Sequence, residues 1–208
     1  PLLISLINRP YIDTRISFSS LIPKNLEYEL SNKLCNHYLN KLKNNPDLHD
    51  KVEFDICFTC NTINLYNKLN ILKNNGFNID EINEINKELV ILTNNIVDPK
   101  MQMIKKEYKR LDKLEKYRNK ILSDKSDKID TDKIYELTQI LKKYGTLPFS
   151  NLARFAFIGK SILLSFVEEN IITNERYNEF METIHTISKD MSRDIYLYSI
   201  NNISKKEF

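Results

Sequence analysis

Glycine is scarce in this chain: Gly76, Gly145 and Gly159 are the only three among its 208 residues. None of them stands in the spacing of a phosphate-binding loop. The nucleophile-elbow pattern G-x-S-x-G and the zinc pattern H-E-x-x-H are also absent. The phosphate cradle, acidic metal ligands and basic clamp of a nucleotide-driven kinase are therefore not visible in this sequence, and no familiar catalytic signature is complete.

Charge of one sign and long apolar runs are lacking too. The formal net charge is only +3 and no compact basic cluster stands out, so we expect no nucleic-acid partner. No apolar run reaches the 18 or so residues of a membrane span, since the longest, residues 158–167, is interrupted by polar side chains and a glycine. A signal peptide is absent and the first residue is not Met, so we expect an excised segment of a cytoplasmic protein with no membrane partner.

The chain has three cysteines, Cys35, Cys57 and Cys60. An odd number of cysteines in a chain without an export signal predicts that the thiols are reduced. Cys57 and Cys60 have the C-x-x-C spacing of a metal or redox pair. The alternative is a coincidence inside a strand-like stretch, which we favour because neither a second cysteine pair nor a nearby histidine completes a zinc site. We accordingly expect no metal site in this chain.

The three histidines, His37, His49 and His185, lie near a helix, in a loop and inside the last predicted helix, respectively. For each of them a surface or capping position fits better than catalysis.

Hydrophobic periodicity predicts a mostly α fold with a small N-terminal β-sheet, an α+β class. Residues 1–7 are apolar and fit a buried strand or the end of a helix, and alternation predicts strands over residues 11–21 and 52–59. Gly76 and Gly145 are each expected to end a helix.

Residues 123–131 are predicted to form a polar loop, and the 100–130 region a projecting charged hairpin. Charges of both signs are interleaved in this region, which fits a solvated helix face better than a surface for an acidic partner. We expect a single helical domain, 1–208, with helices over residues 26–42, 64–75, 80–95, 101–122, 132–144, 151–169 (the most apolar, expected in the core) and 173–199.

Two polar clusters stand out against this background. The first is the predicted strand face that carries Asp13, Arg15, Ser17 and Ser19. The second is a compressed turn with Thr146, followed by Arg154 in an otherwise apolar helix. Lysine outnumbers arginine 24 to 7, so an arginine indicates a place where the planar guanidinium fork is needed. The clusters form either a ligand site or an internal ion-pair network, in which Asp13, Glu53 or Asp55 would be the partners of Arg154.

Four stretches occur in this order: RPYIDTRISFSSLIP (9–23), NPDLHDKVEFDICFTC (45–60), ELVILTNNIVD (88–98) and KKYGTLPFSNLARFAFI (142–158). They resemble the central region of the phosphoenolpyruvate synthase and pyruvate phosphate dikinase family. Within it, the chain is most similar to the ATP-dependent L-glutamine kinases of capsular phosphoramidate biosynthesis, whose AT-rich coding suits its 25 asparagines. The resemblance covers nearly the whole chain.

The resemblance implies that this chain is the central domain of a larger phosphotransferase. Such enzymes bind ATP and Mg²⁺ in one domain and carry the phosphoryl group on a histidine in another. No histidine here matches that motif, so we expect no catalytic residue and no cofactor in this segment, and no activity from it alone.

The acceptor would be the side-chain amide of L-glutamine. A guanidinium fork suits its α-carboxylate, and Asp13 or Asp55 suits its α-ammonium. The hydroxyls of Ser17, Ser19 and Thr146 are suited to orient the amide. The substrate-binding set is therefore expected to be Asp13, Arg15, Ser17, Ser19, Asp55, Thr146 and Arg154. The alternative is a non-catalytic linker or docking module between the nucleotide and histidine domains.

Overall fold

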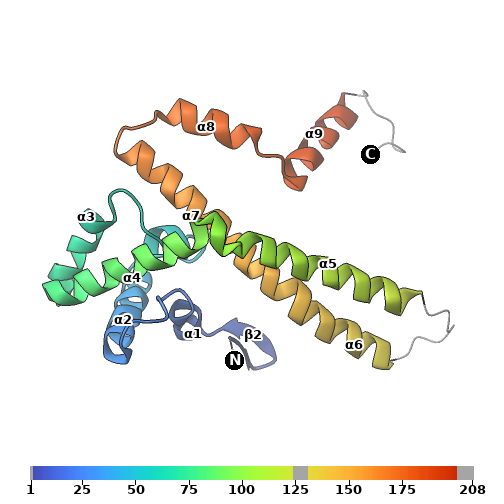
Figure 1. Ribbon diagram of the computed structural model, residues 1–208, viewed down its shortest axis with the longest axis horizontal. Coiled ribbons are helices and arrows are strands. Elements are labelled where there is room, and N and C mark those ends of the chain that lie inside the picture. Colours follow the sequence, from blue (N-terminus) through green and yellow to red (C-terminus); the bar gives the residue numbers. More distant parts are fainter. Residues whose placement is uncertain (1, 124–130, 201–208) are drawn as a thin grey trace. The chain divides into compact units, whose positions relative to one another are not determined.

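The computed structural model describes residues 2–123 and 131–200 of the chain. It is 76% helical with a two-stranded antiparallel sheet near the N-terminus (Figure 1), which confirms the predicted fold class. The predicted polar loop falls mainly on residues 124–130, outside the described residues. The elements are, in order, β1 (Leu3–Leu6), β2 (Arg9–Ile12), α1 (Thr14–Ser19), α2 (Tyr28–Asn44), η1 (Pro46–Leu48), η2 (Val52–Ile56), α3 (Leu65–Leu69), η3 (Asn70–Asn75), α4 (Ile79–Val97), η4 (Pro99–Met101), α5 (Met103–Leu122), α6 (Thr131–Leu141), η5 (Lys142–Thr146), α7 (Leu147–Glu168), α8 (Asn174–Thr183) and α9 (Ile187–Ser199).

The chain divides into two compact units, Pro1–Ile162 and Leu163–Phe208, and the boundary falls within α7. The first unit holds the sheet, the hydrophobic core and most of α7. The second holds the end of α7 with α8 and α9.

The sheet lies earlier in the chain than the predicted strand. β1 and β2 pair with Leu3 opposite Ile12 and Leu6 opposite Arg9. The strand predicted over residues 11–21 is wrong beyond Ile12, because Asp13 caps a helix there: its Oδ1 accepts a hydrogen bond from the Ile16 amide at 3.1 Å. Apolar residues 1–7 do supply a strand, but its side chains are exposed or half-buried rather than buried.

The strand predicted over residues 52–59 is also wrong. Val52–Ile56 forms a single π-helical turn, in which the Cys57 amide donates to the Val52 carbonyl at 2.9 Å. Ile56 and Cys57 are consecutive and both buried, so the side chains do not alternate between two faces as a strand requires.

The hydrophobic core of the first unit is built by α1 to α4 around Tyr38, which is completely buried. The ring of Phe18 on α1 meets Tyr38 edge-on at 6.1 Å, and the Tyr38 hydroxyl accepts a hydrogen bond from the Phe58 amide at 3.2 Å. Helix α2 contributes Leu30 and Leu34 at the spacing predicted from sequence. The segment between η2 and α3 is thereby fixed to the same core as α1.

The ends of the core helices follow local rules. Gly76 has a φ of 81° and ends η3, as predicted, because a residue with a side chain rarely adopts this left-handed conformation. Helix α4 begins at Ile79, one residue earlier than expected, and Asn78 and Glu81 form a capping box at its start.

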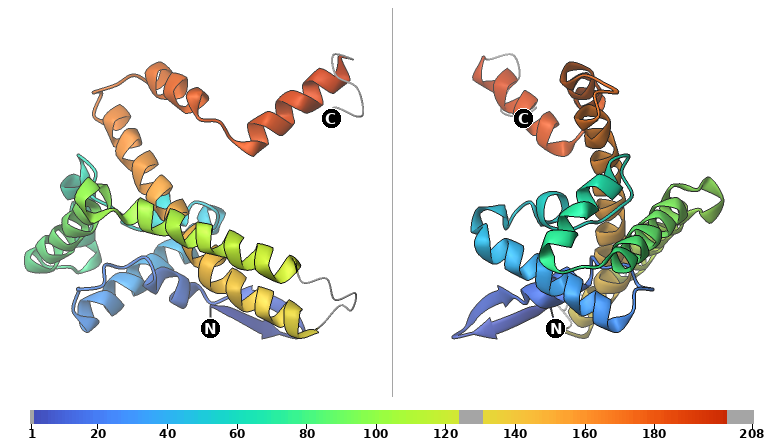
Figure 2. Two further views of the ribbon diagram at one scale, coloured as in Figure 1. Left: turned by 45° about the vertical axis from the view of Figure 1, so that its right-hand side comes forward. Right: turned by 90° about the vertical axis from the view of Figure 1, so that its left-hand side faces the viewer.

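Helices α5 and α6 lie side by side (Figures 1 and 2) and form a hairpin. The prediction that Gly145 ends a helix is wrong, since α6, η5 and α7 are continuous. Gly145 instead allows close packing: a Cβ at this position would lie 2.7 Å from a Leu141 methyl and 3.2 Å from one of Leu114 on α5.

Helix α7 is not a core helix, although its sequence is apolar. Ile158, Pro148 and Ser165 are buried, whereas Phe149 and Leu147 are exposed. Judged by length and composition only, the continuous helix Thr131–Glu168 is long and apolar enough to cross a membrane. The apolar runs in the sequence did not predict such a helix. One such helix is weak evidence by itself: the core helix of a soluble protein also passes this test, but a core helix is mostly buried, and here only 11% of the apolar window is buried.

The second unit replaces the single helix predicted over residues 173–199 with two. Thr173 caps α8 as expected, through a hydrogen bond from the Arg176 amide. Thr186 caps α9 in the same way. His185 therefore lies between two helices rather than inside one.

Candidate functional site

Helix α1 carries the first polar cluster, and most of its polar groups are engaged locally. Asp13 is the N-cap, and its amide donates to the Leu2 carbonyl at 2.8 Å, which fastens α1 to the hairpin. The Ser19 hydroxyl donates to the Arg15 carbonyl at 2.8 Å, and the Ser17 carbonyl accepts from the Ser20 hydroxyl at 2.6 Å. These side chains lie around a short helix and not along one face of a strand.

Arg15 is exposed and extends from α1 toward α2. Its Nη2 donates to Oδ1 of Asn36 at 2.7 Å. Asn36 is neutral, so the guanidinium keeps its full charge, and no carboxylate forms an ion pair with it among the described residues. Arg15 thus presents a positive group with unused donors at the surface.

Arg154 on α7 binds the C-terminal end of α1. Its Nη1 donates to the Ser20 carbonyl at 2.8 Å and its Nη2 to the Leu21 carbonyl at 3.3 Å. A cation at this end of a helix satisfies carbonyls that lack a partner within the helix. Asp13, Glu53 and Asp55 were the expected partners, but Arg154 forms no ion pair with them in the described structure. The internal network is therefore one of main-chain hydrogen bonds and not of ion pairs.

The rest of the guanidinium is enclosed. Its Nε is buried and has no hydrogen-bond partner among the described residues. Burial lowers the pKa of Arg154 from its usual value, while the nearby Cys57 and Cys60 oppose that shift. Phe54 meets Phe157 edge-on at 5.4 Å close by, and Lys160 lies 4.7 Å above the Phe54 ring. Arg154 is thus at the centre of a contact between α7, α1 and the η2 segment.

Cys57 and Cys60 are free, buried thiols. Burial raises the pKa of both, and for Cys57 the neighbouring Glu53 raises it further. Both thiols therefore stay protonated at neutral pH, which makes them poor nucleophiles and poor metal ligands. Cys35 is buried as well, with its Sγ 3.7 Å from the Ser19 hydroxyl.

The two other predicted site residues lie apart from Arg15. Thr146 is exposed at the end of η5, about 12 Å before Arg154 along the helix axis at 1.5 Å per residue. Asp55 is exposed on η2 and near Lys41, whose pKa is lowered by burial while Asp55 opposes the shift. The structure therefore brings Asp13, Arg15, Ser17, Ser19 and Arg154 together around α1, and it does not bring Thr146 or Asp55 into contact with them.

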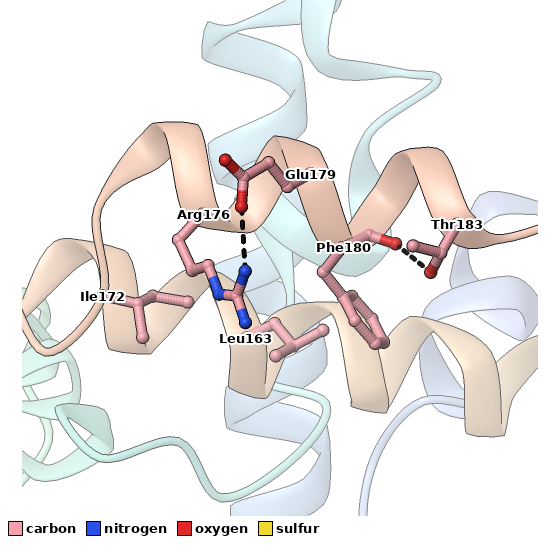
Figure 3. Close-up of a pocket in the computed structure, with 6 residues that line it drawn as sticks. All are labelled: Leu163, Ile172, Arg176, Glu179, Phe180 and Thr183. Atoms are coloured by element: carbon pink, nitrogen blue, oxygen red, sulfur yellow. Dashed lines mark hydrogen bonds and ion pairs between the residues drawn. The ribbon is translucent and has the colours of Figure 1, made fainter.

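A pocket that sequence reasoning did not find lies within the second unit. It has a volume of about 300 Å³ and is lined by Leu163, Ile172, Arg176, Glu179, Phe180 and Thr183 (Figure 3). Arg176 is bound to Glu179 at 2.9 Å, and the Thr183 hydroxyl donates to the Phe180 carbonyl at 2.7 Å. Because these polar groups are already paired, the pocket offers mainly apolar surface. No motif or residue spacing in the sequence indicates this pocket.

Two of the three histidines, His37 and His49, have local partners. His37 packs edge-on against Phe77 at 6.0 Å, and burial, with a contribution from Lys41, lowers its pKa. The Nδ1 of His49 is 3.1 Å from the Pro46 carbonyl. Among residues 2–123 and 131–200, no group of three or more potential ligands is placed to hold a metal ion.

No family model, no curated protein and no solved structure matches this chain.

Proposed function

We propose that this chain is the central domain of an ATP-dependent, phospho-histidine phosphotransferase, with the side-chain amide of L-glutamine as acceptor. The observation that carries the proposal is that the first, second and fourth stretches with the family resemblance, although far apart in sequence, meet around Arg154, and that the third contacts the residue directly after the second. Arg154, from the fourth stretch, binds the Ser20 and Leu21 carbonyls of the first and lies beside Cys57 of the second. The hydroxyl of Thr93, from the third, accepts from the amide of Asn61, which directly follows the second.

The local geometry supports different functions for the two arginines. Arg15 is exposed, uncompensated by a carboxylate and held by one bond to Asn36, so it is suited to bind the α-carboxylate of an amino acid. Arg154 donates two hydrogen bonds to main-chain carbonyls, and its Nε is buried. It is therefore suited to position α1 rather than to contact the acceptor. Asp13, Ser17 and Ser19 lie on or next to α1 and complete the proposed acceptor site.

ATP and Mg²⁺ would bind in another domain of the parent protein, as would the histidine that carries the phosphoryl group. The proposal includes a cytoplasmic location, since ATP is the phosphoryl donor. It also implies that the isolated chain releases no AMP from ATP in the presence of glutamine.

The test is Arg15→Lys in the intact enzyme. Lysine keeps the charge but lacks the planar fork, so the KM for the acceptor should rise about ten- to a hundredfold, the effect of losing one charge-assisted hydrogen bond. ATP-dependent phosphorylation of the histidine should be unchanged, because that half-reaction takes place in other domains. Asn36→Ala, which removes only the neutral partner of Arg15, is the matched control and should change KM less.

A second candidate function, a non-catalytic linker or docking module, is favoured by one observation. Phe149, Leu147 and Phe157 leave much of the apolar surface of α7 exposed, with Phe149 at 71%. Such a surface fits the neighbouring domains of a longer protein. If Arg15→Lys lowers thermal stability and leaves the acceptor KM unchanged, the linker function replaces acceptor binding.

A further inference from the structure

The charge of the chain is concentrated on helix α5. Its 20 residues contain eight basic and three acidic side chains, a net charge of +5, whereas the whole chain carries only +3. The remainder of the chain therefore has a net charge of −2. One of the three acids, Glu107, is buried and bound by Arg110 and Asn151, so it does not offset the charge at the surface of the helix.

Six of the basic residues share one face of α5. At 3.6 residues per turn they fall within an arc of about 100°, and at 1.5 Å per residue they extend over about 22 Å. We call this set the lysine row; it consists of Lys105, Lys106, Lys109, Lys113, Lys116 and Lys120.

The lysine row lies on an exposed face of α5. All six side chains are exposed, and none forms an ion pair with another described residue. The opposite face of α5 packs on η5 and α7: Leu114 lies against Gly145, and the buried Glu107 accepts a hydrogen bond from Asn151. The row continues onto η5, where Lys143 lies 5.2 Å above the Tyr144 ring, and Tyr144 stacks on Tyr117 of α5 at 5.4 Å.

On sequence alone the interleaved charges of residues 100–130 favoured a solvated helix face, but six lysines gathered on one exposed face of α5 change that interpretation. We propose that the lysine row is a docking surface for an acidic protein helix, one that repeats Glu or Asp every three to four residues. Side chains at this spacing form a stripe of the same width and period as the lysine row, and opposite charges across a contact favour association and orientation. A helix packed alongside at the usual 8–10 Å separation would cover all six lysines at once. The proposal is independent of the phosphotransferase function.

Three features favour an acidic helix over a nucleic acid or a membrane. The lysine row contains no arginine, which is the side chain that binds phosphate oxygens in pairs. Tyr117 is already stacked on Tyr144, so it is not free to stack on a base. Finally, the row is one helix wide and has no apolar side chain within it that would insert between lipids.

The experiment measures binding by fluorescence anisotropy of a labelled helical peptide of about 20 residues, with Glu at every fourth position in an alanine background, long enough to span the lysine row. A peptide with Gln in place of each Glu is the ligand control. We expect the Glu peptide to bind the complete 208-residue chain, the Gln peptide not to bind, and the affinity to fall as salt rises toward physiological ionic strength.

The decisive variant is the triple substitution Lys109→Gln, Lys113→Gln and Lys116→Gln, since glutamine keeps helix propensity and adds no repulsion. At low salt it should weaken binding of the Glu peptide about tenfold, given typical energies of surface ion pairs. The matched control exchanges three exposed lysines elsewhere, Lys24, Lys73 and Lys87, for Gln and should change binding less than about twofold.

Circular dichroism of both triple variants checks that the helices are intact. The proposal is overturned if the two variants lose equal affinity, because net charge alone then explains binding. It is also overturned if single-stranded RNA or phosphatidylserine vesicles bind the lysine row more tightly than the Glu peptide.

Discussion

Replacing Arg154 by Met tests whether the contact between α7 and α1 stabilises the first unit. Met retains the apolar stem of the side chain but loses the hydrogen bonds to the Ser20 and Leu21 carbonyls at 2.8 and 3.3 Å. A hydrogen bond from a charged donor contributes about 1.5–3 kcal/mol, and the more distant of the two counts at the lower end.

One effect acts in the opposite direction. The buried Nε without a partner already costs the native protein about 1–3 kcal/mol, and the substitution removes that cost. Taking the middle of both ranges, the net loss in the free energy of unfolding should therefore be about 2 kcal/mol. For a chain of this size, that lowers Tm by about 4–8 °C.

The assay is urea unfolding followed by circular dichroism at neutral pH, together with amide hydrogen exchange. The amides of α1 should exchange faster in Arg154→Met, because the helix loses its C-terminal partner, while those of α4 should change less. Arg15→Met is the control: its single bond to Asn36 is exposed, so it should alter stability by less than about 0.5 kcal/mol. If Arg154→Met is as stable as the native chain, the guanidinium does not hold α1, and the structural explanation of this arginine is refuted.

Two other predictions concern glycine and cysteine. Gly76→Ala should destabilise the chain by about 1–2 kcal/mol, because φ is 81° at this position. Gly159→Ala should be neutral or stabilising by up to about 1 kcal/mol, because this glycine is in a helix and nothing lies within 4 Å of the added Cβ. Urea unfolding of the two variants measures both effects, and equal free energies of unfolding would contradict the backbone conformations assigned to the two glycines. Burial raises the pKa of Cys57 and Cys60, so both thiols should react slowly with Ellman's reagent at pH 8 in the native chain and rapidly in denaturant. Fast reaction of the native chain would contradict this, because it would show that these thiols are accessible.

The corrections to the predicted elements have a common physical cause. Residues 11–21 alternate between apolar and polar, but the pattern is short enough to fit a helix that buries one residue, and Phe18 is the only buried side chain of α1. The Asp13 cap, a local interaction, then favours the helix. In the same way, Thr186 is as good an N-cap as Thr173, and it divides the single helix predicted over residues 173–199.

Gly145 illustrates a choice that the sequence left open. A glycine after a helical pattern fits a helix end, but it also fits a place where two helices approach closely. Only the position of Leu114 on α5, 31 residues earlier in the chain, distinguishes the two. The same holds for Arg154, since an arginine in an apolar helix must find partners, but sequence does not say whether they are carboxylates, a ligand or main-chain carbonyls.

By itself the sequence determined the class of the fold, the presence of helix α2, the end of η3 at Gly76 and the start of α8 at Thr173, because these depend on periodicity and on side chains within one turn of each other. It also singled out Arg15 and Arg154 as unusual. The tertiary structure alone decided that α7 lies largely outside the core, that Arg154 binds the end of α1, and that six lysines of α5 remain without partners. These outcomes depend on which faces of distant helices meet, and that is set by packing between segments far apart in the chain rather than by any local pattern.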